Sequence, residues 1–179
     1  MERSVDTEIQ FSGLKSGVYD YDFTLDDRFF SEYKNEKILG GKVVFNVRLE
    51  KKERLLTFFF NYSGVVRTTC DRCLEEMDWP VEGEQALYVK FSDTEQSDNE
   101  DVVILPEKAY KIDLAQWMYE YVVIAMPIQC THPDDINGNP TCDPEMLKYL
   151  AEENEESEVG EPGEEKIDPR WEALRNLKD

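Results

Sequence analysis

Basic side chains are scarce in this chain of 179 residues, which has 20 Lys and Arg against 40 Asp and Glu and a formal net charge of −20 at pH 7. Proteins bind nucleic acids mainly by neutralising phosphates with Lys and Arg, and RNA repels a strongly acidic chain at long range. The composition therefore favours a basic protein as the partner over direct binding to RNA.

Histidine is scarcer still, because His132 is the only one in the chain. A Ser/His/Asp or Cys/His catalytic arrangement would have to use this residue, which precedes a proline in a turn-rich stretch and has no strand-turn nucleophile nearby. A glycine-rich phosphate loop is also missing, since the pair Gly40-Gly41 stands alone and indicates the start of a strand. The sequence therefore predicts a protein that is not an enzyme and has no small-molecule substrate.

Long apolar runs are missing as well. No stretch approaches the roughly 20 apolar residues that span a bilayer. The N-terminal residues Met1 to Asp6 lack the basic segment and apolar core of a signal peptide. We therefore expect a cytoplasmic protein without a membrane partner.

The acidic residues gather in two short runs, 92–101 and 152–165, which hold 13 carboxylates and no basic residue. The second run contains Gly160, Pro162 and Gly163, and its composition is typical of disorder. Such runs either serve as solubilising linkers or attract a basic partner. We predict a domain over 1–151, a disordered acidic linker over 152–167 and a short amphipathic helix over 168–179.

The N-terminal half has the two-residue period of β-strands. Residues 18–25 alternate, with four apolar side chains on one face: Tyr19, Tyr21, Phe23 and Leu25. Residues 42–51 and 54–63 are rich in Val, Leu and Phe and are joined by a polar link, which predicts an antiparallel hairpin. Gly64 indicates a bulge or bend, and residues 80–91 form a further strand.

Helical patterns begin early but become prominent late in the chain. Asp26 is expected to cap a short helix over 27–34, and Asp113 a helix over 114–126 that Pro127 ends. After an irregular stretch, a short helix runs from Asp143 or Pro144 to Leu150. We therefore predict an α+β fold, with an antiparallel sheet that could close into a barrel in the N-terminal half and helices packed late in the chain.

The four cysteines form two groups. Cys70 and Cys73 make a Cys-x-x-Cys pair at the end of a strand, while Cys130 and Cys142 bracket the loop that contains His132. Two residues between thiolates let a tight turn aim both sulfurs at one metal, and a later loop can supply the remaining ligands of a tetrahedral zinc site. We expect structural zinc on Cys70, Cys73 and Cys142, with His132 or Cys130 as the fourth ligand.

A cytosolic dithiol redox protein that uses Cys70 and Cys73 is the alternative. In a thioredoxin-type site the motif opens a helix, which lowers the pKa of the first thiol. Here the chain soon returns to a strand, and Asp71 and Glu75 oppose a thiolate. A structural disulfide is disfavoured in the cytosol. Four buried cysteines without a role are the plainest alternative.

Two groups of residues are candidates for contact with a partner. Arg67 and Arg72 flank the first cysteine pair and could present charge beside a metal site. The terminal segment has an apolar stripe behind an Asp-Pro helix start, together with a basic residue: Arg170, Trp171, Leu174 and Leu177. This helix either docks on its own sheet, which we favour because so short a helix is marginal alone, or binds a groove on a partner.

The chain also resembles a known family. The relevant elements are a strand-rich first half, Cys70-Asp71-Arg72-Cys73-Leu74, an Ile112-Asp113-Leu114 helix start with Met126-Pro127 at its end, the Cys/His loop, and Asp168-Pro169-Arg170-Trp171 with Leu174 and Leu177. In combination they are similar to the YceD family of large ribosomal RNA subunit accumulation proteins, in a Bacteroidetes-like form. The resemblance covers nearly the whole chain and is weakest over the first sixty residues.

This resemblance implies a bacterial or plastid protein that is needed for accumulation of 23S rRNA and has no known catalytic activity. Its partner would be a ribosomal protein or precursor rRNA of the large subunit. The family's cysteine pairs correspond to Cys70 and Cys73, and in the later loop to Cys142. Many relatives have a second compact Cys-x-x-Cys in that loop, where this chain has Cys130, His132 and Cys142 instead.

Overall fold

The computed structural model describes residues 5–92 and 102–149. The chain divides into two compact units, Met1–Thr141 and Cys142–Asp179. In the second unit residues 144–149 are helical, and Asp143 caps them by accepting hydrogen bonds from Glu145 N–H and Leu147 N–H. The short helix expected there is therefore present, while the predicted linker and terminal helix lie outside the described residues.

A five-stranded sheet forms the frame of the first unit, in the order β2-β3-β4-β5-β6. The strands are β2 (Gly17–Leu25), β3 (Gly40–Lys51), β4 (Leu55–Thr69), β5 (Glu76–Phe91) and β6 (Val102–Leu105). Neighbours pair antiparallel except β5 and β6, which are parallel. The predicted α+β class and largely antiparallel sheet are confirmed, but the sheet is open, because β2 and β6 form separate edges and it does not close into a barrel.

The strand predictions hold with one correction. Tyr19, Tyr21 and Phe23 are half-buried and Leu25 is buried, as the alternation indicated, and β3 begins at Gly40. Gly64, however, is not a bulge or bend: β4 runs through it in unbroken register with both neighbours. A Cβ at this position would meet the backbone carbonyl of Lys42, so glycine is needed here for the close approach of β3.

A second, two-stranded sheet pairs β1 (Glu8–Gln10) with β7 (Lys111–Asp113). The Thr7 hydroxyl donates to the Asp113 carboxylate at 2.6 Å, and Lys111 makes an ion pair with Glu8. The sequence analysis did not anticipate these strands, which are only three residues long. They bring the N-terminal segment beside the start of the main helix.

The first helix is capped as predicted. The Asp26 carboxylate accepts hydrogen bonds from Arg28 N–H and Phe29 N–H at the start of α1 (Asp27–Ser31). Phe29 and Phe30 are buried and Tyr33 is half-buried, although Tyr33 lies beyond the helix, which is shorter than the predicted 27–34.

The second helix, α2 (Ala115–Ala125), begins one residue later than expected, with Leu114 at the N-cap position. Asp113 ends β7 instead, yet its carboxylate still accepts a hydrogen bond from Ala115 N–H. The helix stops before Pro127, as predicted. No helix of the described residues is long and apolar enough to cross a membrane.

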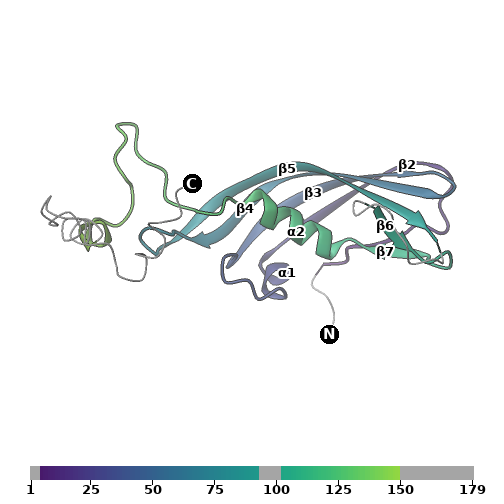
Figure 1. The fold of residues 1–179 in the computed structure, drawn as a ribbon, viewed down its shortest axis with the longest axis horizontal. Coiled ribbons are helices and arrows are strands. Elements are labelled where there is room, and N and C mark those ends of the chain that lie inside the picture. Colours follow the sequence, from purple (N-terminus) through teal and green to yellow (C-terminus); the bar gives the residue numbers. More distant parts are fainter. Residues whose placement is uncertain (1–4, 93–101, 150–179) are drawn as a thin grey trace, which may run out of the picture. The chain divides into compact units, whose positions relative to one another are not determined.

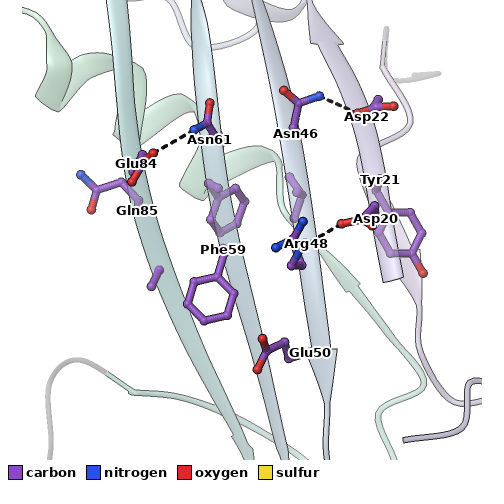
Figure 2. A pocket seen from close by; sticks show the side chains of 13 residues that line it. Asp20, Tyr21, Asp22, Asn46, Arg48, Glu50, Phe59, Asn61, Glu84 and Gln85 are labelled. Carbon is purple, nitrogen blue, oxygen red and sulfur yellow. Dashed lines mark hydrogen bonds and ion pairs between the residues drawn. The ribbon is translucent and has the colours of Figure 1, made fainter. Parts of the chain in front are cut away.

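Both helices lie on the same side of the sheet (Figure 1). The ring of Tyr121 packs against Phe60 at a centroid distance of 5.1 Å, and the Tyr62 hydroxyl donates to the Tyr121 carbonyl. Tyr33 stacks on Tyr119 at 3.8 Å, which links the α1 region to α2. The inner face of β2–β5 therefore belongs to the core, while the outer face carries alternate, mostly exposed side chains (Figure 2).

Candidate metal centre

The Cys-x-x-Cys pair forms the turn between the two longest strands, β4 and β5. Cys70 N–H donates to the Glu75 carbonyl at 2.8 Å, and Leu74 N–H donates to the Cys70 carbonyl at 2.9 Å. Leu74 has a φ of 63°, a left-handed conformation that few non-glycine residues adopt. The chain therefore reverses between Cys70 and Glu75 and holds both cysteines on one tight turn.

The loop that follows α2 is fastened to this turn by a pair of hydrogen bonds. Asp71 N–H donates to the Cys130 carbonyl, and Cys130 N–H donates to the Asp71 carboxylate, both at 2.7 Å. The Lys37 ammonium also donates to the Ile128 carbonyl at 2.8 Å. Because Cys130 is held opposite Asp71, the residues just beyond it lie beside the two cysteines.

Four side chains converge as a result: Cys70, Cys73, His132 and Cys142, whose ligand atoms all lie within 4.8 Å of one another. Within this group, Cys73 Sγ and His132 Nδ1 lie 3.3 Å apart. Cys142 follows Thr141, whose hydroxyl donates to the Pro133 carbonyl at 2.6 Å and so holds the chain close to His132. The three cysteines are buried and the histidine is half-buried.

The surroundings of Cys70 favour a thiolate. Burial raises the pKa of this thiol, but the backbone N–H groups of Cys73, Arg72 and His132 donate to the sulfur, and the net effect lowers the pKa to about 6. Arg72 N–H lies 3.4 Å from the sulfur. Backbone donors of this kind stabilise a charged sulfur in place of water, which is the form that binds a metal.

Cys130 is the cysteine that the cluster leaves out. Its thiol faces the Pro127 carbonyl at 3.8 Å, and burial, together with the Asp71 carboxylate, raises its pKa. A neutral thiol that donates to a carbonyl is not poised to ligate a metal. Of the two candidates left open for the fourth place, the geometry brings in His132 and leaves out Cys130, whose backbone positions the loop.

The donor set suits zinc. Three thiolates and one imidazole form one of the common tetrahedral zinc sets, and at a Zn–S distance of about 2.3 Å neighbouring ligand atoms would lie roughly 3.5 to 3.8 Å apart. The observed spacings could reach these values by small side-chain movements. Zinc held by Cys70, Cys73, His132 and Cys142 would join the β4–β5 turn to the later loop and would supply no redox chemistry.

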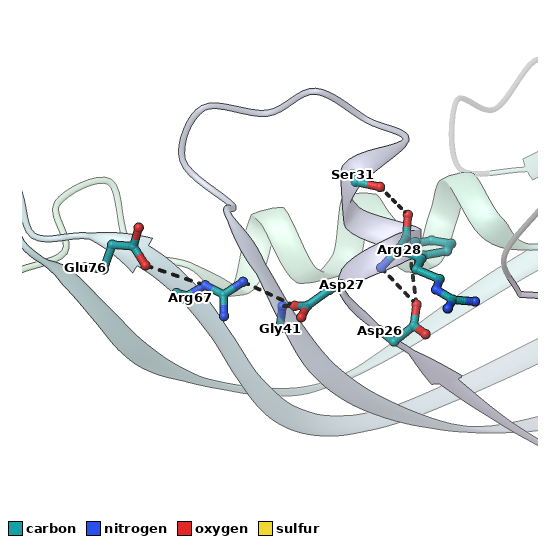
Figure 3. A network of polar contacts seen from close by, with 8 residues as sticks. Asp26, Asp27, Arg28, Ser31, Gly41, Arg67 and Glu76 are labelled. Carbon is teal, nitrogen blue, oxygen red and sulfur yellow. Dashed lines mark hydrogen bonds and ion pairs between the residues drawn. The ribbon is translucent and has the colours of Figure 1, made fainter.

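The two arginines that the sequence placed beside the site are both engaged with carboxylates. Arg67, on β4, lies 3.5 Å from Asp27 and 3.7 Å from Glu76 (Figure 3). Arg72, inside the cysteine turn, lies 3.6 Å from Asp134 in the later loop. Both therefore join elements of the first unit. The other candidate partner residues lie outside the described part of the chain: Arg170, Trp171, Leu174 and Leu177.

Sequence reasoning missed two residues that position the site. Asp71 was considered only as a charge that opposes a thiolate, whereas its carboxylate binds the Cys130 backbone. Thr141 had no recognisable signal, because its role depends on a contact with Pro133 that only the folded loop brings about.

A family model described as "Large ribosomal RNA subunit accumulation protein YceD" matches residues 59–178, a span that includes all four residues of the cluster. No curated protein and no solved structure is detectably similar to the chain.

Proposed function

Because the chain belongs to the YceD family of large ribosomal RNA subunit accumulation proteins, we propose that it supports accumulation of 23S rRNA in the cytoplasm as a non-enzymatic factor in assembly of the large ribosomal subunit. The family match over residues 59–178 is the observation that carries this proposal.

The grouping of Cys70, Cys73, His132 and Cys142 supports a structural role for the site. Its four side-chain donors would fill a tetrahedral site, whereas catalytic zinc sites have three protein ligands and leave one position to water or substrate. A closed site contributes to folding, because the free energy of metal binding is also free energy of folding. We propose that zinc holds the later loop on the β4–β5 turn and that the protein acts by binding a partner.

The net charge supports a protein partner over bare RNA. A chain with 40 acidic and 20 basic residues is repelled by phosphates, and two of its arginines, Arg67 and Arg72, already pair with carboxylates. Ribosomal proteins that bind rRNA are basic, as that task requires. We propose that the partner is a basic protein of the large subunit, held by this acidic chain during assembly.

The functional test is deletion of the gene in its native host, with 23S and 16S rRNA measured in the same cells. A fall in 23S relative to 16S rRNA, restored by the wild-type gene, is expected. Normal 23S levels in the deletion strain would refute the proposal.

The partner is tested separately by purifying the tagged protein from growing cells at physiological salt and identifying what accompanies it. A basic large-subunit protein is the expected result, and rRNA fragments without any ribosomal protein would reverse the assignment. Repeating the purification after deletion of residues 168–179 asks whether the terminal segment, with Arg170, Trp171, Leu174 and Leu177, is required for partner binding.

A dithiol redox function has one observation in its favour, the pKa of about 6 at Cys70. Burial argues against it, because Cys70 is 0% exposed and Cys73 is 3% exposed, so a disulfide substrate has no access to either sulfur. The motif also lies in a hairpin turn and not at the start of a helix. Thiol titration with and without a chelator distinguishes the structural role from the redox role. Thiols that react only after a chelator removes zinc support the structural role. A metal-free protein whose Cys70 exchanges with disulfides supports the redox role.

A further inference from the structure

The outer face of the five-stranded sheet has more apolar surface than a solvated face requires. Antiparallel sheets with one face in water normally carry polar side chains there. Here five large apolar side chains on the outer face are 37 to 58% exposed: Val18, Val44, Phe59, Val65 and Tyr88. Helices α1 and α2 lie on the opposite side of the sheet (Figure 1). Among residues 5–92 and 102–141, no helix or strand covers this face.

A groove of about 670 Å³ crosses the middle of this face, from β2 to β5. Adjacent strands lie about 4.8 Å apart, so the groove is roughly 14 Å long, the length of about four residues of extended chain. Phe59 lies near its centre, with Arg48 opposite it on β3 and Ala86 opposite it on β5 (Figure 2). An extended peptide would lie over this exposed ring.

The groove is acidic in a specific pattern. Its lining holds four carboxylates and one guanidinium, those of Asp20, Asp22, Glu50, Glu84 and Arg48. The guanidinium is already paired, since Arg48 Nε lies 3.1 Å from Asp20. Three carboxylates therefore remain without a cationic partner among the described residues, which gives the groove a net negative charge.

Two of these three carboxylates are held in place by neutral donors. Asn46 Nδ2 donates to Asp22 at 2.6 Å, and Asn61 Nδ2 donates to Glu84 at 3.0 Å (Figure 2). An amide fixes the orientation of a carboxylate without cancelling its charge. Asn46 and Asn61 are themselves cross-strand neighbours. A row of four polar side chains therefore crosses the sheet from β2 to β5: Asp22, Asn46, Asn61 and Glu84. Its two ends are anionic, and β4, the strand of Phe59, lies between them.

We propose that this groove, defined by Asp22, Glu50, Phe59 and Glu84, binds an extended, arginine- and lysine-rich segment of a partner protein. Carboxylates at fixed positions pair with guanidinium and ammonium groups, and the exposed face of Phe59 can accept a cation by stacking. The same charges repel the phosphates of RNA. The inference rests on the proposed function to the extent that the partner there is a basic ribosomal protein.

Binding is tested with the full chain and a fluorescein-labelled peptide of alternating arginine and glycine, followed by fluorescence anisotropy. Asp22→Asn combined with Glu84→Gln removes two groove charges and is expected to weaken binding about tenfold. Phe59→Ala is expected to weaken it about threefold. All three side chains lie on the solvent face, and circular dichroism melting checks that each variant remains folded.

Glu36→Gln combined with Glu53→Gln is the matched control, because it removes the same charge from two exposed loop residues outside the groove. Binding should then change less than about twofold, the effect of net charge alone. Equal weakening by both double variants would show that the peptide senses only net charge, and would overturn the proposal. Tighter binding of a single-stranded RNA oligonucleotide than of the peptide, sensitive to the groove variants, would also overturn it.

The groove proposal and the proposed function can be refuted independently of each other. If the deletion strain keeps normal 23S rRNA, the function fails whatever the peptide does. If the strain loses 23S rRNA but the groove variant restores it and binds the peptide as wild type does, only the groove proposal is refuted.

Discussion

Asp71 and Cys130 are joined by two hydrogen bonds of 2.7 Å, one between their backbones and one from Cys130 N–H to the Asp71 carboxylate. Asp71 directly follows the first cysteine of the turn, and Cys130 lies two residues before His132. This pairing of residues 59 positions apart sets the distance between the turn and the imidazole. The site is therefore assembled by the backbone as well as by its ligands.

Asp71→Ala is predicted to weaken zinc binding without abolishing it. The substitution leaves Cys130 N–H without its side-chain acceptor, at a cost of about 1 to 3 kcal/mol, while the backbone bond from Asp71 N–H remains. Competition with a chromophoric chelator measures the affinity. Asp71→Asn keeps an acceptor oxygen and is the matched control, so affinity that falls equally in both variants would contradict the role assigned to this bond.

Cys73→Ser and Cys130→Ser are predicted to behave differently although both cysteines are buried. Cys73 belongs to the cluster, so its loss should remove zinc and more than about 3 kcal/mol of stability, seen as a fall in Tm of roughly 10 °C. Cys130 lies outside the cluster and a serine hydroxyl can still donate to Pro127. Zinc per chain, measured by elemental mass spectrometry with melting alongside, distinguishes them. Loss of zinc from the Cys130 variant alone would refute the assignment.

His132→Cys is predicted to retain zinc, whereas His132→Ala should bind it at least about tenfold more weakly. A fourth thiolate converts one common tetrahedral set into another, while alanine leaves a coordination position to water. Cobalt substitution provides the readout, because the intensity of thiolate-to-metal charge-transfer bands follows the number of sulfur ligands. Identical cobalt spectra for wild type and the alanine variant would show that His132 is not a ligand.

Gly64→Ala is predicted to destabilise the fold by about 2 to 3 kcal/mol, at the upper end of common single substitutions. Its Cβ would lie 2.6 Å from Val43 Cα and against the Lys42 carbonyl, so the backbones of β3 and β4 would have to separate. Gly13→Ala is the control, because nothing lies within 4 Å of the added methyl group. Thermal or urea unfolding measures both, and an unchanged Tm for Gly64→Ala would contradict the close approach.

Local sequence patterns predicted the long elements well, for physical reasons that the structure makes plain. The alternation from Tyr19 to Leu25 is readable because one face of β2 packs on the core and the other is in water. Three-residue strands such as β1 and β7 are too short to show a period. The parallel pairing of β6 with β5 joins residues only 14 positions apart, whereas two strands with so short a connection usually pair antiparallel. Gly64 was misread because glycine serves bulges and close approaches alike.

The site was predictable in composition but not in detail. The spacing of Cys70 and Cys73 identified the turn, and the grouping of His132 with two cysteines identified the second loop. The choice between His132 and Cys130 could not be made from spacing, because it depends on which way each side chain points once Cys130 pairs with Asp71.

The cysteine turn lies between strands of 15 and 16 residues that keep one register over their whole length. In such a pair a slip of one residue exchanges the two faces of a strand, and on β5 it would turn Glu82 and Lys90 inward in place of Val81 and Val89. Closing the turn in one geometry therefore decides, for the entire hairpin, which side chains enter the interior. Zinc bound by Cys70 and Cys73 would hold this turn closed and would thereby favour the correct alignment of β5 over its whole length.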